Sequence, residues 1–152
     1  MNKMTGSVTI ALTIMCAMLC PALGAPTSQQ VAGYERRLKS HQDDLIVIAR
    51  NVRDRDAEIA INLIELAHLY SVELAHVQDL LLIDSLIQGE ADRRRVKTVT
   101  GARIKSVADG IDLSIKKVNL GLARLNSQAV VTTATKIRDD LRALKELLLS
   151  SD

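Results

Sequence analysis

Two pairs of side chains with the same spacing are the residues of this sequence best suited to chemistry. Glu65 and His68 form one pair, and Glu73 and His76 form the other. Within an α-helix, each pair would lie one turn apart on the same face. Carboxylate and imidazole groups at this spacing hold metal ions in the cores of some helical bundles. Together with His41, these residues suggest one hypothesis: a small protein that binds a divalent transition metal.

A structural or surface role for these side chains is the stronger interpretation, and we expect no cofactor. In ferritin-like bundles the two Glu-x-x-His pairs belong to different helices, whereas here both fall on one segment. The pairs are also interleaved with the apolar residues Ile61, Leu69, Val72 and Ile83. This mixture predicts a second, partly polar contact face on that helix.

The elements that carry these residues are predicted by apolar periodicity. Apolar residues recur in alternating steps of three and four over residues 31–52, 59–81, 104–125 and 130–148. This spacing is typical of helices that pack through heptad seams in bundles and coiled coils. We therefore predict an all-α fold, an antiparallel helical bundle of about four helices, in a single domain over residues 25–152.

The predicted boundaries between the helices differ in their signals. Gly89, with Asp92 after it, separates the second helix from the third, and Asn126 or Ser127 begins the fourth. Residues 51–56 contain no glycine. At that boundary, the alternative is therefore that the first two helices continue as a single long helix.

Charge is distributed unevenly along the chain, although the whole carries only +2. Residues 54–92 contain nine acids and one base, whereas residues 93–124 contain nine bases and two acids. We expect these two segments to attract each other as a hairpin, with the charges helping register more than stability. The basic cluster Arg93, Arg94, Arg95 and Lys97 is then a balancing face, with weak contact to an anionic envelope surface as a further possibility.

The first 24 residues predict a signal peptide. Lys3 precedes an apolar run over residues 8–19, Pro21 ends that run, and Ala22-Leu23-Gly24 resembles a cleavage site before Ala25. The run is shorter than the roughly 20 apolar residues of a membrane-spanning helix. We therefore expect a protein that is exported to the periplasm or secreted. Cleavage would also remove every Cys and Met of the chain, which excludes zinc bound by cysteines, iron–sulfur clusters and thiol chemistry.

Composition and motifs narrow the function further. Aromatic residues make up 1% of the chain, so a stacking site for sugars or single-stranded nucleic acid is not expected. No phosphate-binding glycine loop, nucleophile elbow or His-Glu-x-x-His motif occurs. The second helix is apolar nearly all round, and surplus apolar surface usually marks a partner. We predict a non-enzymatic interaction or structural protein of the bacterial cell envelope. Its partner would be a second copy or another helical protein, and not nucleic acid.

Overall fold

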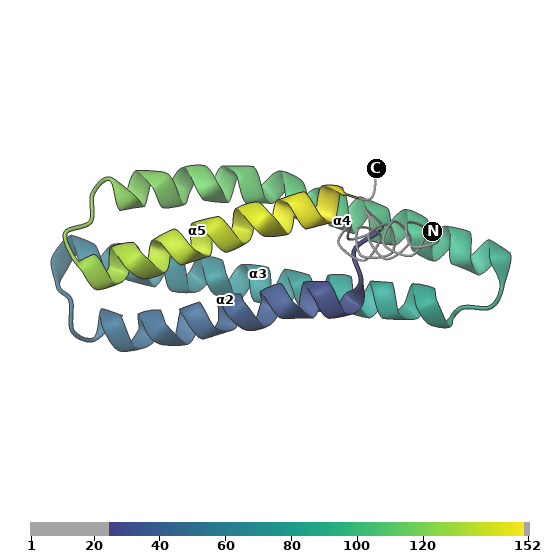
Figure 1. The fold of residues 1–152 in the computed structure, drawn as a ribbon, viewed down its shortest axis with the longest axis horizontal. Coiled ribbons are helices and arrows are strands. Elements are labelled where there is room, and N and C mark those ends of the chain that lie inside the picture. Colours follow the sequence, from purple (N-terminus) through teal and green to yellow (C-terminus); the bar gives the residue numbers. More distant parts are fainter. Residues whose placement is uncertain (1–24, 151–152) are drawn as a thin grey trace, which may run out of the picture.

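The computed structural model describes residues 25–150, which form four α-helices and no strand. The helices are α2 (Ser28–Ala49), α3 (Asp54–Leu86), α4 (Glu90–Leu122) and α5 (Gln128–Leu149). Successive helices run in opposite directions, and α2 also packs against α5 to close the bundle (Figure 1). The all-helical fold with four helices confirms the prediction. The predicted signal peptide, residues 1–24, lies outside the described residues.

The bundle begins at a well-capped helix end. Thr27 and Gln30 form a capping box, in which the Gln30 N–H donates to Thr27 Oγ1 at 3.2 Å and the Thr27 N–H donates to Gln30 Oε1 at 2.8 Å. These two bonds satisfy backbone donors that a helix start leaves without partners. The start of α2 is therefore fixed by the chain's own side chains.

The turn between α2 and α3 rules out the single long helix considered as an alternative. Helix α2 ends at Ala49 and α3 begins at Asp54, which has a positive φ of 53°. A left-handed residue reverses the chain, and aspartate tolerates this conformation better than most residues other than glycine. A tight turn therefore forms here although residues 51–56 contain no glycine.

Asp56 connects the start of α3 to the start of α5. Its carboxylate accepts hydrogen bonds from the Asn126 N–H at 3.2 Å and from the Ser127 N–H at 2.7 Å. Ser127, the residue before α5, makes no capping bond with its own side chain. A carboxylate from a different helix thus accepts hydrogen bonds from the backbone donors at the start of α5. Its negative charge also interacts favourably with the positive end of the helix dipole.

The core of the bundle is aliphatic. The large side chains that are fully buried come from all four helices and include Leu38, Leu45, Leu74, Ile111, Leu141 and Leu144. Burying such side chains is the main stabilising contribution in a domain with few aromatic residues. The core therefore uses the apolar positions that define the predicted helices.

Helices α3 and α4 extend well beyond the other two. Each has 33 residues, against 22 in α2 and in α5. The buried residues of α3 end at Val77, and those of α4 begin at Thr100. Residues 78–99 form the end of the α3–α4 hairpin, called the projecting hairpin below. Its base still contacts α2, where Gln78 donates a hydrogen bond to Glu35 at 3.0 Å, and its tip extends beyond the start of α2 and the end of α5, seen on the right in Figure 1.

Candidate functional site

The outer surface of α3 and α4 holds most of the exposed apolar side chains in the part of the chain that the structure describes. Nine of the eleven large exposed ones belong to these two helices: Ile61, Leu69, Val72, Leu82, Ile83, Leu86, Val99, Leu113 and Leu120. Among them are the four residues predicted to form a second contact face of α3, which are between 41% and 53% exposed. The structure thus places that predicted face at the surface, facing away from the core.

Part of this surface has heptad spacing. Leu69, His76 and Ile83 recur every seven residues on α3, and Val99, Ser106, Leu113 and Leu120 do so on α4. With Asn62, seven residues before Leu69, these eight residues are called the outer seam below. All eight are exposed. Seven-residue spacing places each set on one stripe of its helix, as in the contact surface of a coiled coil.

The two halves of the outer seam border a common groove. A groove of about 560 Å³ between α3 and α4 is lined by Asn62 and Leu69 on one side and by Leu120 on the other. Gly121 allows α4 to lie close to α3 here, because a Cβ at this position would lie only 3.3 Å from Ile59 Cγ2. At this end of the bundle the α3 and α4 stripes therefore face the same groove, and heptad spacing continues each stripe along its helix beyond the groove.

Charged residues flank the same groove. Glu58 and Glu65 of α3 stand on one wall together with Arg55, and Lys117 of α4 and Arg124, which follows the end of α4, stand on the other. Within residues 25–150, a single ion pair joins α3 to α4, between Glu73 and Arg103. The expected attraction between the two segments is thus realised at one contact, and the charges along the groove are not paired across it.

The predicted metal-binding residues do not converge. Glu65, His68 and His76 are exposed on α3, and Glu73 pairs with Arg103. His41 lies on α2 against α5 instead of joining them. Across residues 25–150, no group of three or more His, Cys, Asp or Glu side chains is arranged to hold a metal ion.

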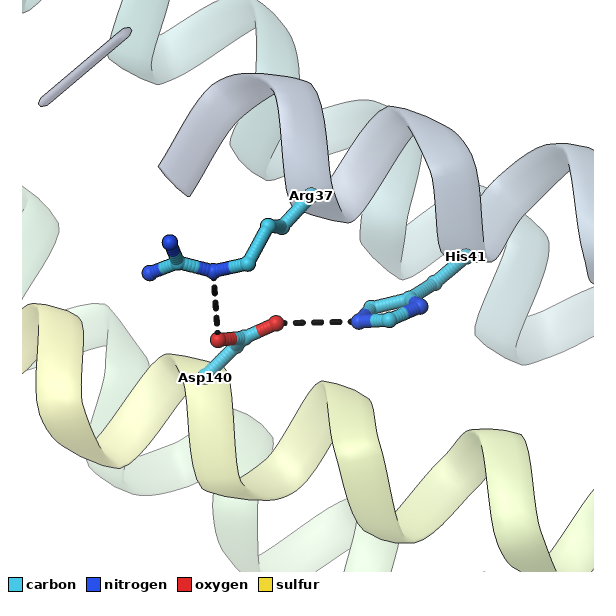
Figure 2. Close-up of polar contacts among 3 residues, drawn as sticks. All are labelled: Arg37, His41 and Asp140. Carbon is cyan, nitrogen blue, oxygen red and sulfur yellow. Dashed lines mark hydrogen bonds and ion pairs between the residues drawn. The ribbon is translucent and has the colours of Figure 1, made fainter. Parts of the chain in front are cut away.

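His41 belongs to a different polar cluster, which joins α2 to α5. Asp140 accepts a hydrogen bond from Arg37 Nε at 2.8 Å, and its other oxygen lies 2.9 Å from His41 Nε2 (Figure 2). The guanidinium of Arg37 also lies 4.0 Å from the centre of the Tyr34 ring, in a cation–π contact. Folding the sequence back at each predicted turn places His41, His68, Asp112 and Asp140 at about the same height along the bundle, but it does not predict that His41 and Asp140 touch. Asp140 satisfies Arg37 Nε and His41 Nε2 together, whereas His41 Nδ1 is buried without a hydrogen-bond partner among the described residues. We interpret this cluster as a structural link between α2 and α5, because its carboxylate binds both Arg37 and His41 of the neighbouring helix.

Two further residues of that predicted level are separated from the cluster. Asp112 of α4 pairs with Lys145 of α5 at 2.7 Å, and His68 lies on the outer side of α3. The side-chain directions, which depend on how each helix is rotated in the bundle, separate residues that share a level.

The basic cluster at the start of α4 is at the surface. Arg93, Arg94, Arg95 and Lys97 are all exposed. Arg93 donates to the Ile87 carbonyl at 2.7 Å, and Arg94 pairs with Glu90. Two of the four therefore stabilise the tip of the projecting hairpin. Contact with an anionic surface through this cluster stays a prediction.

A buried polar contact joins α3 to α4. The hydroxyls of Tyr70 and Ser114 share a hydrogen bond of 2.9 Å, and a Cβ at Gly110 would lie 3.3 Å from the Tyr70 hydroxyl. Burial raises the pKa of Tyr70 above its usual value of 10.0; the Ser114 hydrogen bond acts in the opposite direction and the Glu73 charge adds to the rise.

This raised pKa predicts a loss of stability at alkaline pH. The folded chain holds the Tyr70 proton more tightly than the unfolded chain, so stability falls as pH rises from about 10 through the pKa of the folded state. Denaturant titrations between pH 8 and 11 should show a smaller loss for Tyr70→Phe than for the parent. Tyr34→Phe, a matched change on α2, should keep the parent's loss. Equal slopes for the parent and Tyr70→Phe would contradict the assignment.

Comparisons with protein families, with curated proteins and with solved structures gave no match to this chain. None of the described helices combines the length and hydropathy needed to cross a membrane. The outer seam and the groove beside it are therefore the candidate functional site, on the geometry of the chain itself.

Proposed function

We propose that this chain is an exported, non-enzymatic interaction protein of the bacterial cell envelope, periplasmic or secreted, which works through helix–helix contacts. The observation that carries the proposal is the concentration of exposed apolar side chains on α3 and α4, with heptad spacing along the outer seam. Monomeric proteins rarely expose extended apolar patches, and such patches often mark interfaces. The signal-peptide pattern of residues 1–24 supports the proposed location.

The proposed contact is of the helix-in-groove type. A partner helix lying along the outer seam would cover Leu69, Leu113 and Leu120, whose exposure is otherwise unfavourable. The charged walls of the groove would then favour a partner that presents opposite charges at the matching positions. This mode of binding needs no cofactor.

A photo-cross-linking residue placed at Leu113 tests the proposal in cells that make the protein. We expect cross-linked products from Leu113 and none from Val47, an exposed apolar residue of α2 that serves as the matched control. Equal yields at the two positions, or no product from Leu113, would refute a binding role for this face. The intact mass of the same purified protein reports whether the chain begins at Ala25, as export predicts.

A further inference from the structure

We infer that the partner on the outer seam is a second copy of this chain, with α3 of each copy packed against α4 of the other. The two copies would be related by a two-fold axis that runs along the groove. This inference rests on the proposed function, since it names the partner of the same face. Three features of the surface support it: the levels of its apolar residues, the levels of its charges, and its area.

The residues of the outer seam occur at matching levels on the two helices, and two of these levels are apolar on both helices. Ile59 lies against Gly121 and Tyr70 bonds to Ser114, which fixes the level of α4 relative to α3. Because the helices are antiparallel, seven residues forward on α3 match seven residues back on α4. The outer seam therefore consists of four levels: Asn62 with Leu120, Leu69 with Leu113, His76 with Ser106, and Ile83 with Val99.

A two-fold axis along the groove places each level of one copy against the same level of the other. Leu69 of one copy then meets Leu113 of the second, and the reverse contact forms as well, because an interface between identical copies repeats each contact. Four helices would surround each level, as in a four-helix bundle. The projecting hairpin, which has only two helices, would gain the two that it lacks.

The charged residues beside the groove also lie at matching levels. Glu65 is level with Lys117 and Glu58 with Arg124, and neither pair forms an ion pair within the single chain. In the inferred dimer, each glutamate faces the basic residue of the other copy. Rotating one copy so that α3 met α3 would instead oppose two helices that each carry seven acids and one base. Flanking charges of this kind select partner and orientation in coiled coils.

The face is large enough for a stable dimer. A helix of 33 residues is about 50 Å long, and two adjacent helices present a width of about 20 Å. The resulting area of about 1,000 Å² per copy exceeds the roughly 800 Å² per partner of a standard specific interface. A second copy supplies a complementary surface of the same length, which a short helix from another protein does not.

A charge exchange between copies tests both the partner and its orientation. One variant carries Glu58→Lys and Glu65→Lys, and the other carries Lys117→Glu and Arg124→Glu. By sedimentation velocity at low salt, the parent, expressed from its full sequence, should be a dimer. Each variant alone should associate about tenfold or more weakly, since four contacts become repulsive at once. An equimolar mixture should restore the dimer, because every contact is attractive again.

Several outcomes would overturn the inference. These are a parent that stays monomeric at high micromolar concentration, a mixture that associates no better than its components, or a dimer that persists in Leu69→Ser/Leu113→Ser. Val47→Ser/Leu149→Ser is the control for that pair and should remain dimeric. If a charge variant melts at a lower temperature than the parent, its weaker association could come from unfolding. The comparison of Leu69→Ser/Leu113→Ser with Val47→Ser/Leu149→Ser then decides whether the outer seam is the dimer interface. A monomeric parent whose Leu113 probe still captures a different protein would refute the second copy and leave the proposed function standing.

Discussion

Replacing Leu141 by alanine will lower the free energy of unfolding by about 2–5 kcal/mol. Leu141 is fully buried on α5, so the substitution removes apolar contacts and leaves a cavity that the neighbouring helices fill only in part. We expect no larger effect from a single substitution, because the largest fully buried side chains of this core are leucine and isoleucine. Urea titration monitored by circular dichroism measures it.

Leu149→Ala on the same helix is the matched control. This leucine is 42% exposed, and its loss should cost less than about 0.5 kcal/mol. Neither position lies on α3 or α4, so association through the outer seam does not complicate the comparison. A similar loss of stability at both positions would mean that α5 is not packed as described.

Replacing Asp140 by alanine will cost about 2 kcal/mol, the second largest effect. The change removes the carboxylate that binds Arg37 and His41 at once and thereby joins α2 to α5, which are adjacent in space and distant in sequence (Figure 2). Hydrogen bonds to charged groups contribute about 1.5–3 kcal/mol, and the exposed side of Arg37 reduces its share. Thermal or denaturant unfolding at neutral pH is the measurement.

The neighbouring residue Asp139 provides the control for Asp140. Its side chain is 52% exposed, compared with 18% for Asp140, and it pairs only with Arg138 and Arg142 of its own helix. Exposed pairs of this kind contribute little, so Asp139→Ala should change stability by less than about 0.5 kcal/mol. Equal effects of the two substitutions would show that the link between α2 and α5 is not stabilising.

The helices of this fold could be predicted because the residues that become buried are apolar and recur with the helical period. Leu38, Leu74 and Leu141 are core residues that lie on the predicted stripes. The turn at Asp54 was less predictable, since a positive φ at aspartate leaves no glycine to mark it. The sequence pattern also placed His41 near the level of Asp140. Their contact depends on the rotation of two helices within the bundle, which spacing along the chain does not determine.

Only half of the candidate site was predictable by the same reasoning. Leu69 and Ile83 stood out on α3 because that helix carries more apolar residues than one core face can use. On α4 the inner stripe accounts for most apolar positions, so the sequence pattern did not predict that Leu113 and Leu120 belong to a contact face. The available signal was their heptad spacing with Val99. That Leu120 shares a groove with Asn62 and Leu69 of α3 depends on the packing of the two helices.

The positions of the chain ends give the inferred dimer a direction. Helix α2 begins and α5 ends beside the base of the projecting hairpin (Figure 1). Because the two-fold axis runs along the helices, both copies point the same way. One pole of the assembly would then carry the N- and C-terminal ends of both bundles together with both hairpin tips, and the other pole would carry only turns. Anything that tethers the chain by its ends would therefore hold the hairpin tips of both copies, each with its cluster of exposed arginines, toward the same anchoring surface.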